Sequence, residues 1–242
     1  MIKPHNKNPA GKKEQVRDMF DSIARRYDLL NHLLSMNIDR RWRARVVKMI
    51  LRQSPESVLD VATGTGDLAI AVGRALPAAA LTGVDLSPRM LRIGQEKVAA
   101  RFPGREFPML EGDAERLPFA DASFGAVTCG FGVRNFENLP RGLAEMYRVL
   151  RPGGRVYILE FSMPSQRNAL GRLYRFYFRH ILPGIGRIVS KDARAYTYLP
   201  ESVGEFPYGE RFRTLLSEAG FAAPQSEVLM GGIATIYTAD KP

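Results

Sequence analysis

The sequence predicts an α/β fold, in which a mostly parallel seven-stranded sheet contains one antiparallel strand and carries helices on both faces. Short apolar runs alternate with helical patterns through the middle of the chain, as in parallel sheets whose strands are connected by helices. Near the C-terminus two further apolar runs flank Gly231-Gly232, which is typical of an antiparallel hairpin. The 242 residues, 45% of them hydrophobic, suffice for one sizeable core.

Residues 1–50 are expected to form a helical arm that precedes the main domain, residues 51–242. About a dozen polar residues come first, and apolar side chains then recur at intervals of three and four, which indicates an amphipathic helix. A second helix is expected over residues 46–51, after a basic run. The apolar positions of the first helix are Val16, Met19, Phe20, Ile23, Tyr27 and Leu30.

Expected strands and helices alternate as far as residue 161. The expected strands are residues 57–61, 80–85, 106–110, 123–129 and 155–161. The expected helices between them are residues 68–76, 88–101 and 139–150. Arg151-Pro-Gly-Gly154 is predicted to end the last of these helices and to turn the chain.

After residue 161 the alternation stops, and residues 162–205 are expected to form an insertion that caps the ligand site. A last helix is expected over residues 208–219. The closing hairpin is expected over residues 225–230 and 234–239.

The run Val58-Leu-Asp-Val-Ala-Thr-Gly-Thr-Gly-Asp67 is the most informative about function. Gly64 and Gly66 allow a ligand to approach the backbone closely, since neither has a Cβ. The free N–H groups of the helix that follows face the same ligand. Asp85 ends the next strand, about 20 residues later, where a carboxylate is placed to bind the two hydroxyls of a ribose. The pattern therefore predicts a cofactor that contains adenosine.

The glycine pattern alone also fits the dinucleotide-binding fingerprint. S-adenosylmethionine (SAM) is favoured because Asp60, near the loop, suits a sulfonium and an ammonium, whereas Asp60 and Asp67 together would repel a pyrophosphate. Asp113, in an acidic turn after the third strand, is placed to accept from the adenine amino group. The chain also lacks a second mononucleotide unit for nicotinamide. The sequence thus predicts the Rossmann-like class I SAM-dependent methyltransferase fold, with NAD as the alternative.

The net charge of +10 is unevenly distributed. It is +7 over residues 1–50, zero over 51–164, +6 over 165–195 and −3 over 196–242. The basic surplus is consistent with a solvated surface, an anionic membrane surface or a nucleic acid. Within the insertion, Arg172, Arg175 and Arg179 lie beside an aromatic stripe, as in helices of the membrane interface. The stripe consists of Leu170, Leu173, Tyr174, Tyr177 and Ile181.

The composition argues against export and against a metal site. The one cysteine, Cys129, excludes a disulfide framework, and the start of the chain lacks the apolar segment of a signal peptide. No window approaches 18 uninterrupted apolar residues. His5, His32 and His180 lack ligand spacing. The expected location is the cytoplasm, with peripheral contact at the inner face of the cell membrane as an alternative, and a homodimer is left open.

Four stretches resemble the menaquinone/ubiquinone biosynthesis C-methyltransferase family. They are residues 20–28 with Asn31, the glycine-rich run, Gly130-Phe-Gly-Val-Arg-Asn135, and residues 196–202 followed by Phe206-Pro207. The resemblance runs from about residue 16 to the C-terminus, and its most specific parts are Arg134-Asn135 and the late tyrosine motif. It implies that cofactor contacts fall on Thr65, Asp85, Asp113 and Ala114.

The resemblance implies methyl transfer from SAM to a ring carbon of a polyprenyl quinol, with demethylmenaquinol the first expectation. The alternative substrate is 2-methoxy-6-polyprenyl-1,4-benzoquinol, the ubiquinone precursor. The ring carbon becomes nucleophilic when the neighbouring hydroxyl, with a pKa near ~10, loses its proton. Arg134 is suited to stabilise the phenolate, unless it only pairs with an acid, and Asn135 either orients Arg134 or a water or caps a helix. The proton acceptor stays open among a water, Asp28, Tyr196 and Tyr198.

A nucleic-acid methyltransferase is the remote alternative, because such an enzyme would also be basic. Enzymes that methylate base amino groups usually carry an N/D-P-P-Y/F motif after the fourth strand. The corresponding place here reads Gly-Phe-Gly-Val-Arg-Asn and has no prolines. Nucleic acid is therefore not expected as a partner.

Overall fold

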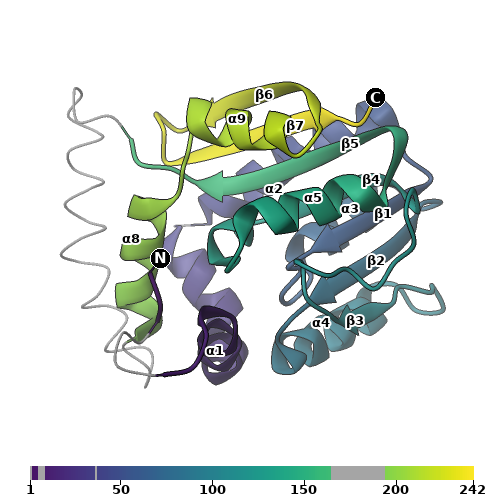
Figure 1. Ribbon diagram of the computed structural model, residues 1–242. Helices are drawn as coiled ribbons and strands as arrows, with labels where there is room; N and C mark the ends of the chain where they lie inside the picture. Colours follow the sequence, from purple (N-terminus) through teal and green to yellow (C-terminus); the bar gives the residue numbers. More distant parts are fainter. Residues whose placement is uncertain (1, 5–8, 36, 165–193) are drawn as a thin grey trace.

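The computed structural model describes residues 2–4, 9–35, 37–164 and 194–242, with the backbone alone at 29–34 and 194–197. The strands form one seven-stranded sheet in the order β3-β2-β1-β4-β5-β7-β6 (Figure 1). They are β1 (Ser57–Val61), β2 (Ala80–Asp85), β3 (Met109–Glu111), β4 (Phe124–Gly130), β5 (Leu150–Phe161), β6 (Ala222–Leu229) and β7 (Ala234–Asp240). The helices are α1 (Lys12–Leu34), α2 (Ile38–Gln53), α3 (Asp67–Ala75), α4 (Pro88–Arg101), α5 (Leu139–Val149), α8 (Arg194–Glu205) and α9 (Glu210–Glu218), with a 3₁₀ turn at Val133–Asn135.

The strand directions are those of the predicted fold. The neighbouring pairs from β3 to β5 are parallel, and β7 runs antiparallel to both β5 and β6. The strand order reverses between β1 and β4, and ligands of open α/β sheets bind outside the carboxyl ends of the strands at such a reversal. The topology therefore places a ligand site beside β1 and β4.

The alternation of side chains along the strands divides the core into two clusters, one on each face. On β5, Val156 and Ile158 pack with α5 and α9, whereas Tyr157 and Leu159 pack with α2, α3 and α4. Helix α2 contributes Trp42 to the second cluster, so this helix packs directly on the sheet. The prediction of helices on both faces is confirmed.

The third strand is shorter than predicted. It begins at Met109 rather than at residue 106, because Pro108 has no N–H to donate to the ladder. Arg105, just before the predicted strand, stabilises the end of α3 and the turn after it. Its guanidinium donates to the carbonyls of Gly73, Leu76 and Ala79 at 2.6–3.1 Å.

The fifth strand is longer than predicted, and the expected turn at residues 151–154 lies inside it. Gly153 adopts φ +76°, which a residue with a side chain would rarely take. Its N–H donates to the carbonyl of Lys241 at 2.8 Å, and the N–H of Lys241 donates to Gly154 at 2.9 Å. Lys241 thus holds residues 153–154 in the sheet. The sequence of residues 151–154 alone gives no sign of this pairing.

Helix α1 lies beside the carboxyl ends of the strands, next to α8 (Figure 1). Its apolar side chains Val16, Met19 and Ile23 pack with Met90 of α4 and Tyr198 of α8. None of the helices in the described ranges combines the length and apolar character that crossing a bilayer demands.

Candidate active site

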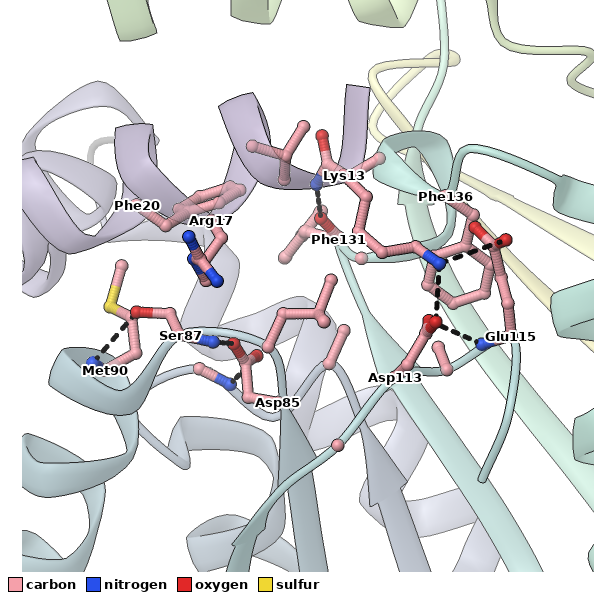
Figure 2. A pocket seen from close by; sticks show the side chains of 18 of the residues that line it. Lys13, Arg17, Phe20, Asp85, Ser87, Met90, Asp113, Glu115, Phe131 and Phe136 are labelled. Atoms are coloured by element: carbon pink, nitrogen blue, oxygen red, sulfur yellow. Dashed lines mark hydrogen bonds and ion pairs between the residues drawn. The ribbon is translucent and has the colours of Figure 1, made fainter. Parts of the chain in front are cut away.

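A cavity of about 720 Å³ lies at the carboxyl ends of the strands, between the loops that follow them and α1. Figure 2 shows side chains from both sides of it, with Lys13, Arg17 and Phe20 on α1 and Asp85, Ser87 and Asp113 on the loops. Of the predicted cofactor residues, four line this cavity: Gly64, Asp85, Asp113 and Ala114. Asn135, predicted as catalytic, also lines it.

Asp85 holds two of the loops in place. One carboxylate oxygen accepts from the N–H of Gly64 at 2.8 Å, and the other accepts from the N–H of Ser87 at 2.9 Å. Burial raises the pKa of Asp85 to about 6, because its effect exceeds that of the two hydrogen bonds, which lower the pKa. Gly64 adopts φ +55°, and a Cβ there would meet no atom within 4 Å. The backbone of Gly64 is therefore open to a ligand that also reaches Asp85.

Asp113 faces α1. One of its oxygens accepts from Lys13 Nζ at 2.5 Å and the other from the N–H of Glu115 at 2.9 Å (Figure 2). Lys13 also lies 3.7 Å from the Glu115 carboxylate, and the hydrogen bond to Asp113 is the main reason that the pKa of Lys13 is raised. A ligand at Asp113 would thus meet a carboxylate already partly neutralised.

Asp60 lies beneath the glycine loop rather than in the cavity wall. Its two oxygens accept from Thr63 Oγ1 at 2.7 Å and from Thr128 Oγ1 at 2.5 Å, and the residue is buried. Burial raises its pKa to about 6, more than the two hydroxyls lower it. Asp60 thus links the glycine loop to β4.

The raised pKa of Asp60 predicts how stability depends on pH. The folded state favours the protonated acid, so the parent loses stability as pH rises from about 4 to about 6. Asp60→Asn removes this titration. We expect the free energy of unfolding of the variant, relative to the parent, to rise by about 2–3 kcal/mol across this interval and to stay constant above it. Urea unfolding at pH 4.5 and pH 7 measures this difference, with the exposed Asp121→Asn as control. A difference that does not change with pH would contradict the prediction.

Thr65 and Gly66 shape the loop without lining the cavity. Thr65 Oγ1 donates to Asp28 of α1 at 2.5 Å and accepts from Lys97 at 3.1 Å. Gly66 adopts φ +81° at the N-cap of α3, where its N–H donates to the carbonyl of Thr63 at 2.9 Å. Both residues therefore set the conformation from which Gly64 faces the cavity.

Three side chains of α1 bind the loops that follow β1, β2 and β3. Lys13 donates to Asp113, Asp28 accepts from Thr65 Oγ1, and Asp21 accepts from Ser87 Oγ at 2.5 Å. Positions 13, 21 and 28 are eight and seven residues apart, which places them on one face of a helix with 3.6 residues per turn. The loops that surround the cavity are thus held together by α1. Sequence reasoning missed these anchors, because their spacing shows only that they share a face of the helix and not which loops they reach.

Arg134 lies in the wall of a second cavity, of about 580 Å³, which shares Phe136 and Glu137 with the first. Its Nη1 pairs with Glu160 at 2.8 Å and also donates to the carbonyl of Phe131. Glu160 is fully buried, and burial is the main cause of its raised pKa. The expected alternative, a salt bridge to an acid, is therefore present.

Three buried polar atoms near the two cavities have no hydrogen-bond partner among the described residues. They are Arg134 Nε, the hydroxyl of Tyr198 and Asn135 Oδ1. Tyr198 is 3% exposed and lines the second cavity. Buried polar groups normally have a hydrogen-bond partner, so these three atoms are candidates for contact with a polar ligand.

The remaining predicted residues are placed as follows. Asn135 does not cap a helix, because Asn138 caps α5 by accepting from the N–H of Arg141 at 3.1 Å, so that alternative is wrong. The structure describes the backbone of Tyr196, within α8, but not its side chain. Arg172, Arg175, Arg179 and the aromatic stripe beside them lie outside the described residues. Within the described ranges no group of three acidic, histidine or cysteine side chains could hold a metal ion.

The sequence profile of the ubiE/COQ5 methyltransferase family matches residues 9–241. A demethylmenaquinone methyltransferase of Deinococcus radiodurans is 48% identical over 240 residues, 98% of either chain. One of Thermus thermophilus is 47% identical over 93% of this chain and 100% of its own. The ubiquinone/menaquinone biosynthesis C-methyltransferase UbiE of Geobacter sulfurreducens is 48% identical over 95% of this chain and 90% of its own.

Solved structures share the fold at low sequence identity. A SAM-dependent methyltransferase of Thermotoga maritima, described as a possible histamine N-methyltransferase, has a TM-score of 0.60 at 20% identity and covers 93% of this chain and 99% of its own. A putative SAM-dependent methyltransferase of Methanococcus maripaludis has the same TM-score and identity and covers 98% of this chain and 96% of its own. At this identity the likeness shows the Rossmann-like class I fold.

Proposed function

Because the chain belongs to the ubiE/COQ5 methyltransferase family, we propose that it transfers a methyl group from SAM to a ring carbon of demethylmenaquinol. It is a SAM-dependent C-methyltransferase, and relatives that are 43–48% identical carry the name demethylmenaquinone methyltransferase. The observation that carries the proposal is the pair of adjoining cavities. One of them offers the partly buried carboxylate of Asp85, and the other offers buried polar atoms that have no partner among the described residues.

The first cavity is the proposed SAM site. Asp85 accepts from the two ribose hydroxyls, the backbone of Gly64 allows close approach, and Asp113 with Ala114 holds the adenine. Asp60, Thr65 and Gly66 keep the loop in shape from behind. When bound, SAM supplies a methyl group on a positively charged sulfur, which an electron-rich ring carbon can attack. Closure by α1 keeps water away from the site.

The second cavity is the proposed site of the quinol ring. Arg134 Nε donates to the oxygen that becomes a phenolate, while Glu160 holds the guanidinium in position through Nη1. The Tyr198 hydroxyl is available to orient the ring, and Asn135 Oδ1, likewise without a partner among the described residues, belongs to a residue that lines the adjoining first cavity. We assign residues 162–205 to a substrate cap, since Tyr198, Ser202 and Glu205 of α8 line this cavity.

The benzoquinol precursor of ubiquinone is the second candidate, because relatives 47–48% identical are named for both quinones. The test is an assay of the purified protein with each reduced quinol and SAM carrying a labelled methyl group. We expect label on a ring carbon of demethylmenaquinol. Transfer to the benzoquinol alone would shift the assignment, and transfer to neither would overturn the proposal.

We also propose that the enzyme works at the inner face of the cell membrane, where a polyprenyl quinol resides. The support is the net charge of +6 on residues 165–195. Changing Arg172, Arg175 and Arg179 together to Gln is expected to release the protein from anionic vesicles, since each cation contributes on the order of 1 kcal/mol near such a surface. Flotation with phosphatidylglycerol vesicles at low and high salt measures binding.

Activity gives the control for this variant. Turnover of a water-soluble short-chain quinol should change little, whereas turnover of a long-chain quinol in vesicles should fall. If the triple variant and the parent bound vesicles equally, the arginines would belong to an ordinary solvated surface.

A further inference from the structure

Lys12 is a buried cation in the wall of the second cavity. It is the first residue of α1 and is 7% exposed. Its Nζ donates to the carbonyl of Phe136 at 2.6 Å and to that of Arg134 at 3.2 Å. No carboxylate of the described residues lies within ion-pair distance of Nζ. A buried lysine normally needs such a partner, so its position beside a ligand cavity calls for a functional explanation.

The two carbonyls fit a neutral amine. An ammonium has three N–H donors, and only two acceptors face it here. A neutral amine has two N–H donors, which these carbonyls satisfy, and one lone pair. That lone pair is free to accept a proton from a hydroxyl in the cavity.

The surroundings of Lys12 also bring the loss of its proton much closer to physiological pH than for an ordinary lysine. Burial lowers the pKa of Lys12 to about 8, and the positive charge of Arg134 lowers it as well. Glu115 and Glu137 act in the opposite direction, and the N–H of Lys12 donates to Glu137 at 2.9 Å. Glu205 and the Tyr198 hydroxyl, both on α8, line the same cavity. A base with this pKa is suited to remove a proton at pH 7–8.

We propose that Lys12 is the general base that deprotonates the quinol, an inference that rests on the proposed function. The quinol O–H bond breaks, and its proton goes to the lone pair of Nζ while Arg134 stabilises the phenolate. The ring carbon then forms a bond to the methyl group, and the carbon–sulfur bond breaks with its electron pair on sulfur. The ring C–H proton passes to water, and the proton on Nζ returns to the ring oxygen. The products are methylated quinol, S-adenosylhomocysteine and one proton.

The experiment compares Lys12→Gln and Lys12→Arg with Lys241→Gln as matched control. Lys241 also donates to two main-chain carbonyls, those of Tyr147 and Arg148, at 2.9 and 3.3 Å, but it lines neither cavity. We expect kcat of both Lys12 variants to fall at least about a hundredfold, with the SAM Kd unchanged, since proton transfer by a positioned base contributes this much. The parent and Lys241→Gln should show kcat/KM rising with pH around an apparent pKa near 8, and both Lys12 variants should lack this inflection.

A second readout separates a base from a structural cation. A ring-halogenated quinol has a more acidic hydroxyl and needs a base less, so Lys12→Gln should lose far less activity with it than with the parent quinol. If Lys12→Arg turned over quinol like the parent, or the halogen left the loss unchanged, the inference would be wrong. If instead the parent protein methylated no quinol, the proposed function itself would fail.

Discussion

Arg134→Lys is expected to lower kcat by about 10²–10³, which is the usual loss when one donor to a developing oxyanion is removed. Lysine keeps the positive charge beside the buried Glu160, so the fold and the SAM affinity should stay close to those of the parent. It cannot keep the fixed fork of donors, in which Nη1 is engaged by Glu160 and Phe131 while Nε has no partner among the described residues.

Single-turnover kinetics with saturating SAM and quinol measure this change in the methyl-transfer step. Arg134→Met serves as the contrasting variant, because it leaves the Glu160 charge buried and unpaired and should cost about 3–5 kcal/mol of folding free energy. If Arg134→Lys turned over quinol as fast as the parent, Arg134 would have no part in the chemistry. Its role would then be limited to the ion pair with Glu160.

Asp85→Ala is expected to weaken SAM binding by about 2–3 kcal/mol, or roughly 30- to 150-fold in Kd. The variant loses the charged acceptor for the ribose hydroxyls, and it also leaves the N–H groups of Gly64 and Ser87 without their acceptor. Isothermal calorimetry with SAM measures the affinity.

The control for this change is Asp121→Ala, which removes a carboxylate that pairs with Arg148 on the surface. It should bind SAM like the parent. An Asp85→Ala protein that unfolds cooperatively at the parental temperature and still binds SAM with parental affinity would place the ribose elsewhere.

The sequence was sufficient for most of the sheet because most strands contain an apolar run between turn residues, and such signals are local. The first two strands were predicted with the observed bounds, residues 57–61 and 80–85. The third strand was not, because Pro108 delays its start, and neither was the start of the fifth, which depends on a distant partner. Arg105 reaches back to α3, and Gly153 pairs with Lys241.

The same reasoning explains why several predicted residues line the first cavity. Asp85 ends β2, Gly64 and Asp113 come two to three residues after β1 and β3, and the carboxyl ends of parallel strands meet at one edge. Lys12 and Lys13 belong to a polar N-terminal segment, and the sequence contains no local sign that they reach loops 100 or more residues away. Glu160, the partner of Arg134, lies inside an apolar strand, where only the burial of its neighbours reveals that it needs a cation.

The anchors of α1 have a consequence for how the chain matures during synthesis. This helix leaves the ribosome before its loop partners, which follow 37 residues later at Thr65, 66 later at Ser87 and 100 later at Asp113. At about 5–20 residues per second, the last of these is made roughly 5–20 s after the helix. During that interval the apolar side chains of α1 lack their docking surface and are accessible to chaperones. Helix α1 thus completes its docking only after all three loops have been made.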